Sequence, residues 1–233
     1  MSSTLRGFPD PFPVRVDGRR PLRYRTVSGA TRAVMRGWFG SQLDVRELQG
    51  MPHDGPLLVV CNHLSNIDPF LFGGYAPGAM FCMAKRELFA LPPVAWVLGG
   101  CNCYPVERGA PDRWALRTTL QLLARGGRVL IFVEGTRSSR PGMRQVETGV
   151  GFLARRSGVP VLPVAVWGSE NALRRGTLLP RRTNVRVRVG APFRPDIPAV
   201  RHADRAIADE IAGRIAELLP PMYRGLYGAK PAA

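Results

Sequence analysis

The sequence predicts an α/β fold, in which a single domain holds a mostly parallel sheet flanked by helices and an amphipathic helix comes first. Two observations support this prediction. Short apolar runs alternate along the chain with stretches of helical periodicity, which is typical of strand–helix–strand units and a parallel sheet. The chain has 233 residues, of which 45% are hydrophobic, and this is enough to bury one substantial core.

The expected strands are apolar runs bounded by polar turns, and the expected helices are longer segments between them. We expect strands at residues 57–61, 80–84, 103–106, 129–133, 161–166 and 185–189, and helices near 69–75, 111–124, 149–156 and 203–218. In the last strand three valines alternate with two arginines, which predicts one face toward water. No internal repeat or low-complexity linker divides the chain.

The N-terminal region differs from the rest in composition. Residues up to about 25 are rich in Pro, Gly and Arg, and we expect a loose arm there. From 27 to 39, apolar residues recur at helical spacing with arginines between them, which predicts an amphipathic helix. This helix either packs on the core or lies on a bilayer as a basic surface helix. We therefore divide the chain into an arm and helix, residues 1–41, and a domain, residues 42–233.

The first residues, MSSTLRGFPDPFPV, contain no apolar stretch of signal-peptide length, and no window approaches 18 uninterrupted apolar residues. We therefore expect neither a signal peptide nor a spanning helix. The four cysteines have no zinc-site spacing and are interpreted as reduced thiols, so no metal is expected. These features indicate a peripheral protein on the cytoplasmic face of the cell membrane.

The charge of the chain is strongly positive. Lys and Arg total 33 against 17 Asp and Glu, which gives a net charge of +16. Such an excess predicts an anionic partner: nucleic acid, an acidic membrane surface or a phosphorylated substrate. We find no recognition-helix signature and no aromatic single-strand motif, so nucleic acid is the least favoured of the three.

Polar and charged residues follow several expected strands directly. They are Asn62 and His63, Lys85 and Arg86, Arg108, and the segment Glu134, Gly135, Thr136, Arg137 and Ser138. Ligands of parallel sheets bind at the carboxyl ends of the strands, where such residues gather. The sequence therefore predicts a binding or catalytic site at this edge.

His63 and Asp68 are the first candidates for chemistry. On a regular helix, residues five apart point about 140° away from each other, but a turn through Ser65 and Asn66 could bring the carboxylate back to the imidazole. The aspartate would then fix the ring tautomer and leave the other nitrogen as a base. A helix cap explains the same residues, because Asp68 and Pro69 suit the start of a helix. The spacing alone favours the cap.

The segment EGTRS is a candidate anion site. Backbone amides, two hydroxyls and Arg137 could form an anion cradle, and Lys85, Arg108 and Arg137 could converge on one phosphate. An ordinary solvated turn with separate surface charges explains them equally well. The chain has no G-x-S-x-G elbow and no Walker A loop, and the stretch GVGFLA follows a polar segment, so we do not interpret it as a dinucleotide site.

Four motifs in order, NHLSNID, VERG, FVEGTRS and VPVLPVAV, resemble the glycerophospholipid acyltransferase family, particularly the 1-acylglycerol-3-phosphate acyltransferases. The resemblance runs from about residue 42 to residue 173. Asn62, His63 and Asp68 match the N-H-x4-D block, Arg108 the second block, the segment 134–138 the third and Pro163 the fourth. The segment AKREL is also similar and places Lys85 near the acceptor phosphate.

This resemblance implies a reaction and roles for the matching residues. His63, oriented by Asp68, would deprotonate the free hydroxyl of 1-acylglycerol-3-phosphate, which would attack the thioester of acyl-CoA or acyl carrier protein and give phosphatidate. Substrate binding would fall to Lys85, Arg108, Glu134, Gly135, Thr136, Arg137 and Ser138. No cofactor is implied beyond the acyl donor. The alternatives are another lysolipid or glycolipid acceptor and, more remotely, a nucleic-acid-binding protein.

Overall fold

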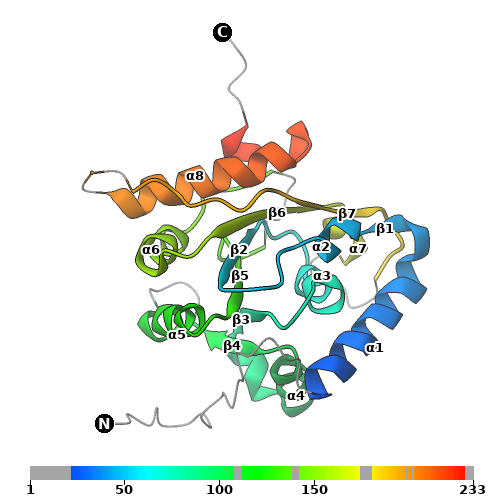
Figure 1. Ribbon diagram of the computed structural model, residues 1–233. Helices are drawn as coiled ribbons and strands as arrows, with labels where there is room; N and C mark the ends of the chain where they lie inside the picture. The colour runs from blue at the N-terminus through cyan, green and yellow to red at the C-terminus, as the bar shows by residue number, and fades with distance from the viewer. Residues whose placement is uncertain are drawn as a thin grey trace, which may run out of the picture.

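The computed structural model describes residues 22–107, 112–137, 142–173, 180–197, 199–200 and 202–228. In these residues one sheet has the strand order β1-β7-β6-β2-β5-β3-β4, and all neighbouring strands are parallel except β6 and β7 (Figure 1). The strands are β1 (Leu43–Asp44), β2 (Leu57–Cys61), β3 (Phe81–Lys85), β4 (Cys103–Val106), β5 (Arg128–Phe132), β6 (Val161–Trp167) and β7 (Val185–Val189). The predicted fold class is confirmed.

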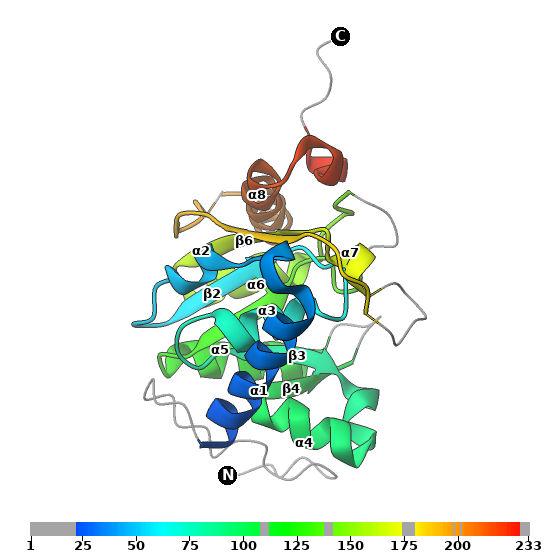
Figure 2. The ribbon, with the colours of Figure 1, turned by 90° about the vertical axis from the view of Figure 1, so that its right-hand side faces the viewer.

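Helices cover both faces of the sheet. They are α1 (Leu22–Phe39), α2 (Arg46–Gln49), α3 (Asp68–Tyr75), α4 (Pro92–Gly100), α5 (Arg113–Ala124), α6 (Thr148–Ser157), α7 (Ser169–Ala172) and α8 (Ala203–Leu218). Apolar residues of α5, α6 and α8 form the core on one face, and those of α1 to α4 pack on the other (Figures 1 and 2). Throughout the described ranges, no helix has both the length and the apolar character needed to cross a bilayer.

Most expected elements are present within a residue or two of their predicted bounds, and four short or unpatterned ones were missed. β1, α2 and α7 contain two to four residues, which is too few for a periodic signal. α4 has the sequence PPVAWVLGG, which lacks a polar face and therefore shows no helical alternation. In β7 the burial of Val185 and Val187 alternates with exposed arginines, as predicted.

The start of α1 corrects the expectation of a loose arm up to about residue 25. The helix begins at Leu22, and Tyr24 is buried. The hydroxyl of Ser28 donates to the Gly73 carbonyl at 2.5 Å, and Nε of Arg32 donates to the Gly74 carbonyl at 2.8 Å, so α1 is tied to α3.

The stretch GVGFLA lies in α6, where its glycine has a packing role. A Cβ added to Gly151 would overlap the backbone of Asp204 in α8, so only glycine allows the two helices to approach this closely. The residue is needed for helix packing, which agrees with our decision not to interpret the stretch as a dinucleotide site.

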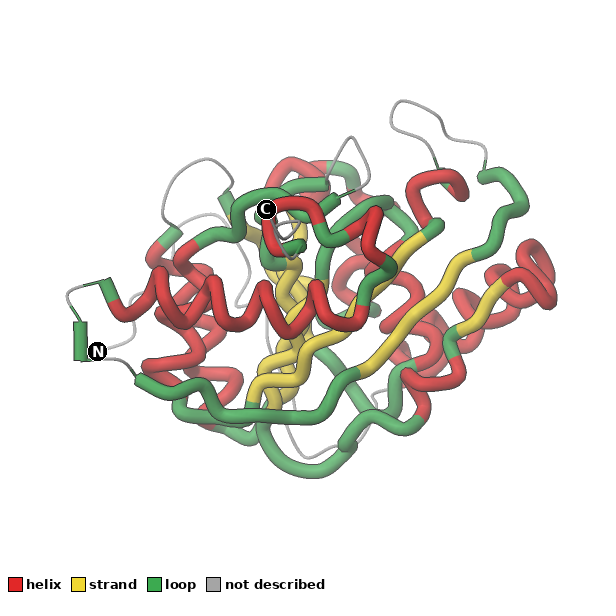
Figure 3. Tube along the Cα trace, turned by 90° about the horizontal axis from the view of Figure 1, so that it is seen from above, coloured by secondary structure: helices red, strands yellow, loops and turns green. Residues whose placement is uncertain are grey.

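The register of the central strands decides where the polar residues after them lie. β2 is buried along its whole length, as expected for a strand with neighbours on both sides and helices on both faces. Cys61 at its end is level with Phe132 of β5 and with Val164 of β6. The strands fan out because the sheet is twisted, and α8 lies across them when seen from above (Figure 3). Residues that follow β2 and β5 therefore emerge side by side.

Candidate active site

The chain turns back on itself between β2 and α3, and this turn brings His63 against Asp68. Nδ1 of His63 lies 2.9 Å from Oδ2 of Asp68, and both side chains are buried. The same Oδ2 accepts hydrogen bonds from the backbone amides of Leu64 and Ser65, each at 2.8 Å. The five-residue spacing is therefore closed by a turn that the carboxylate itself stabilises.

Asp68 begins α3, but its side chain does not cap the helix, so the alternative of a helix cap is wrong. The N-cap position is Ile67, and the bonds of the carboxylate go to the turn before the helix. Its second oxygen, Oδ1, is buried and has no hydrogen-bond partner among the described residues. Buried carboxylate oxygens in purely structural positions are normally paired. The arrangement favours a carboxylate that orients His63.

The contacts of Asp68 also decide which imidazole nitrogen is basic. Oδ2 already accepts from two amides and cannot donate, so Nδ1 of His63 carries the hydrogen of the shared bond. Nε2 is then the nitrogen with a free lone pair. The ring stacks on Phe132 with 4.1 Å between centroids, and Phe132 meets Phe72 edge to face. The imidazole is held in one orientation from two sides.

In the part of the chain that the structure describes, no serine, threonine or cysteine side chain is hydrogen-bonded to the His63 ring. The Ser65 hydroxyl donates to the Leu173 carbonyl at 3.2 Å. Burial, with the nearby carboxylates of Asp68 and Glu134 adding to it, raises the pKa of the Cys61 thiol, which therefore stays protonated at neutral pH.

Asn62 fixes the main chain just before the histidine, a role that sequence reasoning missed. Its side-chain amide donates to the Val166 carbonyl and accepts from the Val166 amide, both at 2.8 Å. This pair of bonds imitates a strand ladder and ties the end of β2 to β6. The signals in the sequence were an amide residue directly after a fully apolar run and the match of Asn62 to the N-H-x4-D block.

Glu134 supports the same main chain from the other side. It is 2% exposed, and its Oε1 accepts from the His63 amide at 3.2 Å. Oε2 accepts from the Arg144 amide at 3.0 Å and lies 3.8 Å from Nε of that residue. Sequence analysis placed Glu134 among the substrate-binding residues. The structure adds a contact to the backbone of His63 that the motif did not reveal.

We expect Glu134→Gln to destabilise the protein, because its NH2 group would face one of the two backbone amides. Burial raises the pKa of Glu134 above its usual 4.5, against the opposing effect of the Arg144 and His63 amides. The native state then binds this proton more tightly than the unfolded chain does. The wild type therefore loses stability relative to the variant as pH rises from the pKa of the unfolded chain to the higher pKa of the native state. Urea unfolding of both proteins from about pH 4 to about pH 8 measures the difference. A difference in unfolding free energy between the two proteins that does not change with pH would contradict the raised pKa of Glu134.

The remaining predicted substrate-binding residues lie at the same strand edge or outside the described part. Gly135 and Thr136 follow β5, and Gly135 has φ of +66°, a conformation that suits glycine. Lys85 ends β3, is about half exposed and pairs with Glu87 at 3.1 Å, while Arg137 is half-buried. Arg108 and Ser138 lie outside the described residues. The convergence of Lys85, Arg108 and Arg137 on one anion stays a prediction.

A cavity of about 530 Å³ lies between α5, α6 and the strands β3 to β5. Its walls are largely aliphatic and aromatic, and include Leu116, Leu130, Val133, Val150, Phe152 and Leu153. Gly135 and Thr136 also line it, so the cavity extends to the edge of the sheet that carries the predicted site. Sequence reasoning could not find it, because its walls come from separate elements.

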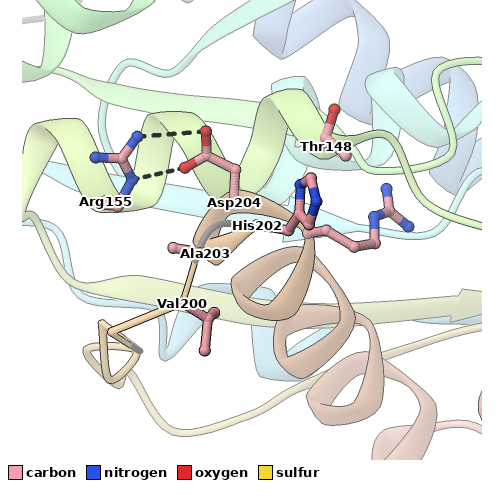
Figure 4. A pocket seen from close by; sticks show the side chains of 7 residues that line it. Thr148, Arg155, Val200, His202, Ala203 and Asp204 are labelled. Atoms are coloured by element: carbon pink, nitrogen blue, oxygen red, sulfur yellow. Dashed lines mark hydrogen bonds and ion pairs between the residues drawn. The ribbon is translucent and has the colours of Figure 1, made fainter.

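A second hollow, of about 410 Å³, lies at the start of α8 (Figure 4). Arg155 and Asp204 face each other there with bonds of 2.6 and 3.3 Å, so their charges compensate. None of the predicted site residues lines this hollow.

Comparison with known proteins decides the family. The model of the Acyltransferase family matches residues 42–167, which is more than half of the chain. This chain belongs to the Acyltransferase family. The resemblance seen in the four motifs is thereby confirmed.

Individual relatives agree with the family match. The 1-acyl-sn-glycerol-3-phosphate acyltransferase of Bacillus subtilis is 27% identical over 199 residues, which is 84% of this chain and 96% of the relative. The lyso-ornithine lipid O-acyltransferase of Pseudomonas aeruginosa is 33% identical over 112 residues, 48% of this chain and 43% of the relative. Matches to two chloroplast acyltransferases span only 40% and 49% of those longer proteins.

A solved structure gives the same picture of the fold. The crystal structure of the 1-acyl-sn-glycerophosphate acyltransferase PlsC from Thermotoga maritima superimposes with a TM-score of 0.68 at 25% identity. The match covers 84% of this chain and 78% of that chain. The acyltransferase-like α/β architecture expected from the sequence is confirmed.

Proposed function

We propose that this protein transfers a fatty acyl group from an acyl thioester to the free hydroxyl of 1-acylglycerol-3-phosphate, giving phosphatidate. The observation that carries the proposal is the buried His63–Asp68 pair, whose ring is hydrogen-bonded to no serine, threonine or cysteine side chain in the described part of the chain. A base without a nucleophile of its own suits a reaction in which the substrate supplies the hydroxyl.

The proposed mechanism uses His63 first as a base and then as an acid. Nε2 takes the proton of the acceptor hydroxyl as its oxygen attacks the thioester carbonyl. When the tetrahedral intermediate collapses, the carbon–sulfur bond breaks and the thiolate receives that proton. Asp68 holds the ring and stabilises the imidazolium that forms between the two steps. General base catalysis of this kind contributes about 10²–10⁴-fold to the rate.

The apolar cavity is assigned to the fatty acyl chain of the donor. Its volume and its aliphatic walls are those of a small-molecule site, and it extends to Gly135 and Thr136 at the strand edge. Acyl-CoA and acyl carrier protein both deliver such a chain as a thioester. The proposal needs no cofactor besides this donor.

The acceptor phosphate is assigned to Lys85, Arg108 and Arg137, together with the hydroxyls of Thr136 and Ser138. Lys85 is free to change partner, because an exposed ion pair such as that with Glu87 is worth only about 0.2–1 kcal/mol. A doubly charged phosphate offers it a stronger partner than one carboxylate.

An anionic membrane surface on the cytoplasmic side is the proposed location of the substrate. The net charge of +16 favours such a surface, and α4 adds an apolar contact. This helix is apolar on all sides, yet Gly100 is its only buried residue, and Leu91 and Trp96 beside and within it are more than half exposed. A helix of this composition is normally covered by protein or lipid. No nucleic acid takes part in the proposal.

A second acceptor is favoured by one observation, the 33% identity to the lyso-ornithine lipid O-acyltransferase. Such an acceptor also carries a free hydroxyl for His63, but its head group is ornithine instead of phosphate. The two acceptors therefore differ in their need for the cationic residues.

The test is an acceptor panel with labelled acyl-CoA and acyl carrier protein, read by product mass. We expect phosphatidate from lysophosphatidate, and less product from the ornithine lipid or a glycolipid. Arg137→Ala should raise the KM for lysophosphatidate about tenfold or more, the value of a charge-assisted hydrogen bond. Arg125→Ala, at an exposed position after α5, is the matched control. Faster turnover of the ornithine lipid would reassign the acceptor, and no product from any acceptor would contradict the function.

A further inference from the structure

We propose that the segment after α8, residues 220–228, is a positioning element of the catalytic centre, which it holds through the loops that follow β5 and β6. We call it the C-terminal segment. It consists of two short 3₁₀ turns, η3 (Pro221–Tyr223) and η4 (Gly225–Tyr227), and lies at the end of α8 (Figure 2). The inference rests on the proposed function, because positioning has meaning only for the reaction that His63 is assigned.

The first set of contacts joins the C-terminal segment to the loop after β5. The Met143 amide donates to the Tyr223 carbonyl, and the Leu226 amide donates to the Met143 carbonyl, both at 3.0 Å. The Val146 amide donates to the Tyr227 hydroxyl at 3.3 Å. The two chain segments are thus paired along several residues.

The approach at this pairing is close. Gly225 has φ of +53°, and a Cβ placed on it would overlap the main chain of Met143. The other side of the loop is held by α8, where Nη2 of Arg205 donates to the Val146 carbonyl at 2.5 Å. Val146 is therefore bonded through both of its main-chain groups.

The second set of contacts joins the C-terminal segment to the turn after β6. The Tyr223 hydroxyl donates to Oε1 of Glu170 in α7 at 2.7 Å. Tyr223 therefore touches both loops, one through its main chain and the other through its side chain. Its ring is buried in the core, so the hydroxyl is held in place.

Both loops lead directly to the main chain around His63. In the loop after β5, the Arg144 amide donates to Oε2 of Glu134, whose Oε1 accepts from the His63 amide. In the turn after β6, the Leu173 carbonyl accepts from the Ser65 hydroxyl. No group of the C-terminal segment has to touch the substrate. Its effect on the reaction would pass through the position of the 62–65 backbone, to which a rate is sensitive at the level of an ångström.

The test removes hydroxyls and leaves the rings. In the double variant Tyr223→Phe/Tyr227→Phe, we expect kcat to fall about tenfold with KM for both substrates unchanged within about twofold. Tyr104→Phe is the matched control. The Tyr104 hydroxyl is also buried and hydrogen-bonds the Thr119 hydroxyl at 2.7 Å, but this bond joins β4 to α5 and involves neither of the two loops. This control should lose some thermal stability and keep its kcat. A double variant with wild-type kcat, or one that loses no more than Tyr104→Phe, would overturn the proposal.

A second measurement tests the connection without using activity. Hydrogen exchange of the double variant should accelerate at the amides of Arg144 and Val146 and also at those of His63, Leu64 and Ser65, and Tyr104→Phe should show neither change. Gly225→Ala, which cannot keep the close approach, should give a larger change in the same places. Acceleration confined to the two paired segments would overturn the proposal. If the wild type acylates no acceptor, the proposed function fails, and the exchange result still decides the connection.

Discussion

His63→Ala is expected to lower kcat by about 10²–10⁴-fold while the protein stays folded. The variant removes the only imidazole in the described part of the chain that is buried against a carboxylate. Asp68 keeps its bonds to the Leu64 and Ser65 amides, so the turn has two of its three supports left and the loss of stability should be about 1–2 kcal/mol. Acyl transfer at saturating substrate, together with a thermal melt, measures both quantities.

The chain offers a matched control for this variant. His53 is also paired with an aspartate, because its Nε2 lies 3.6 Å from Oδ2 of Asp54. Both of these side chains, however, are mostly exposed. His53→Ala should leave kcat and stability unchanged, because an exposed pair of this kind contributes little. Near-normal turnover by folded His63→Ala would remove the histidine from the mechanism and leave the family assignment in place.

Asp68→Asn is expected to reduce kcat by about 10²–10⁴-fold with little change in KM or in the fold. Oδ1 has no partner among the described residues, so an asparagine can place its NH2 group there and keep its oxygen where Oδ2 accepts three hydrogen bonds. The geometry then survives and the negative charge is lost, at a cost of about 1–3 kcal/mol for the NH2 group that is buried without an acceptor. A fall in kcat measures the stabilisation of the imidazolium by that charge.

Asp68→Ala separates this electrostatic role from the structural one. It leaves the Nδ1 hydrogen of His63 and two amides without a partner, and the expected loss is about 3–5 kcal/mol of unfolding free energy. Asp54→Asn, at the exposed pair, is the control for the change of charge. If Asp68→Asn keeps full activity, Asp68 has a structural role alone, and the ring needs no charged partner.

The two sides of the His63 backbone are fixed in different ways. On the β6 side, Asn62 makes two neutral bonds to Val166. On the β5 side, the partner is the buried carboxylate of Glu134, whose raised pKa makes its contribution depend on pH. A side chain held from both neighbouring strands loses little entropy when a substrate binds, which suits the role of base proposed for His63.

The sequence predicted the sheet well where the strands were apolar and flanked by turn residues. Three of the expected strands have the observed bounds, and the others shift by about one residue, because a strand buried on both faces leaves a continuous apolar run in the sequence. The sequence did not predict α4, because this helix has no polar face that would reveal a helical period, and it placed the start of α1 too late. The order of the strands could not be predicted from the sequence, because β2 lies between β5 and β6 through pairings of segments that are distant in the chain.

The candidate site was also predicted in part. Those residues after β2, β3 and β5 that the structure describes lie at one edge of the sheet, while Arg108 and Ser138 lie outside the described residues. The family motifs singled out His63 and Asp68. The spacing alone favoured a helix cap, and the cap is not formed. Glu134 was assigned to the substrate, and its contacts to the His63 and Arg144 amides could not be foreseen because they join segments that are far apart in the chain.

By itself, the sequence determined the family, the class of fold and the residues available for chemistry, because motifs, periodicity and strand-end positions are local properties of the chain. Only the tertiary structure decided how those residues are used. The turn that joins His63 to Asp68, the bonds of Asn62 and Glu134 on either side of the His63 main chain, and the apolar cavity all depend on atoms from separate elements. Local patterns specify elements, whereas the register of β2 between β5 and β6 specifies which side chains meet.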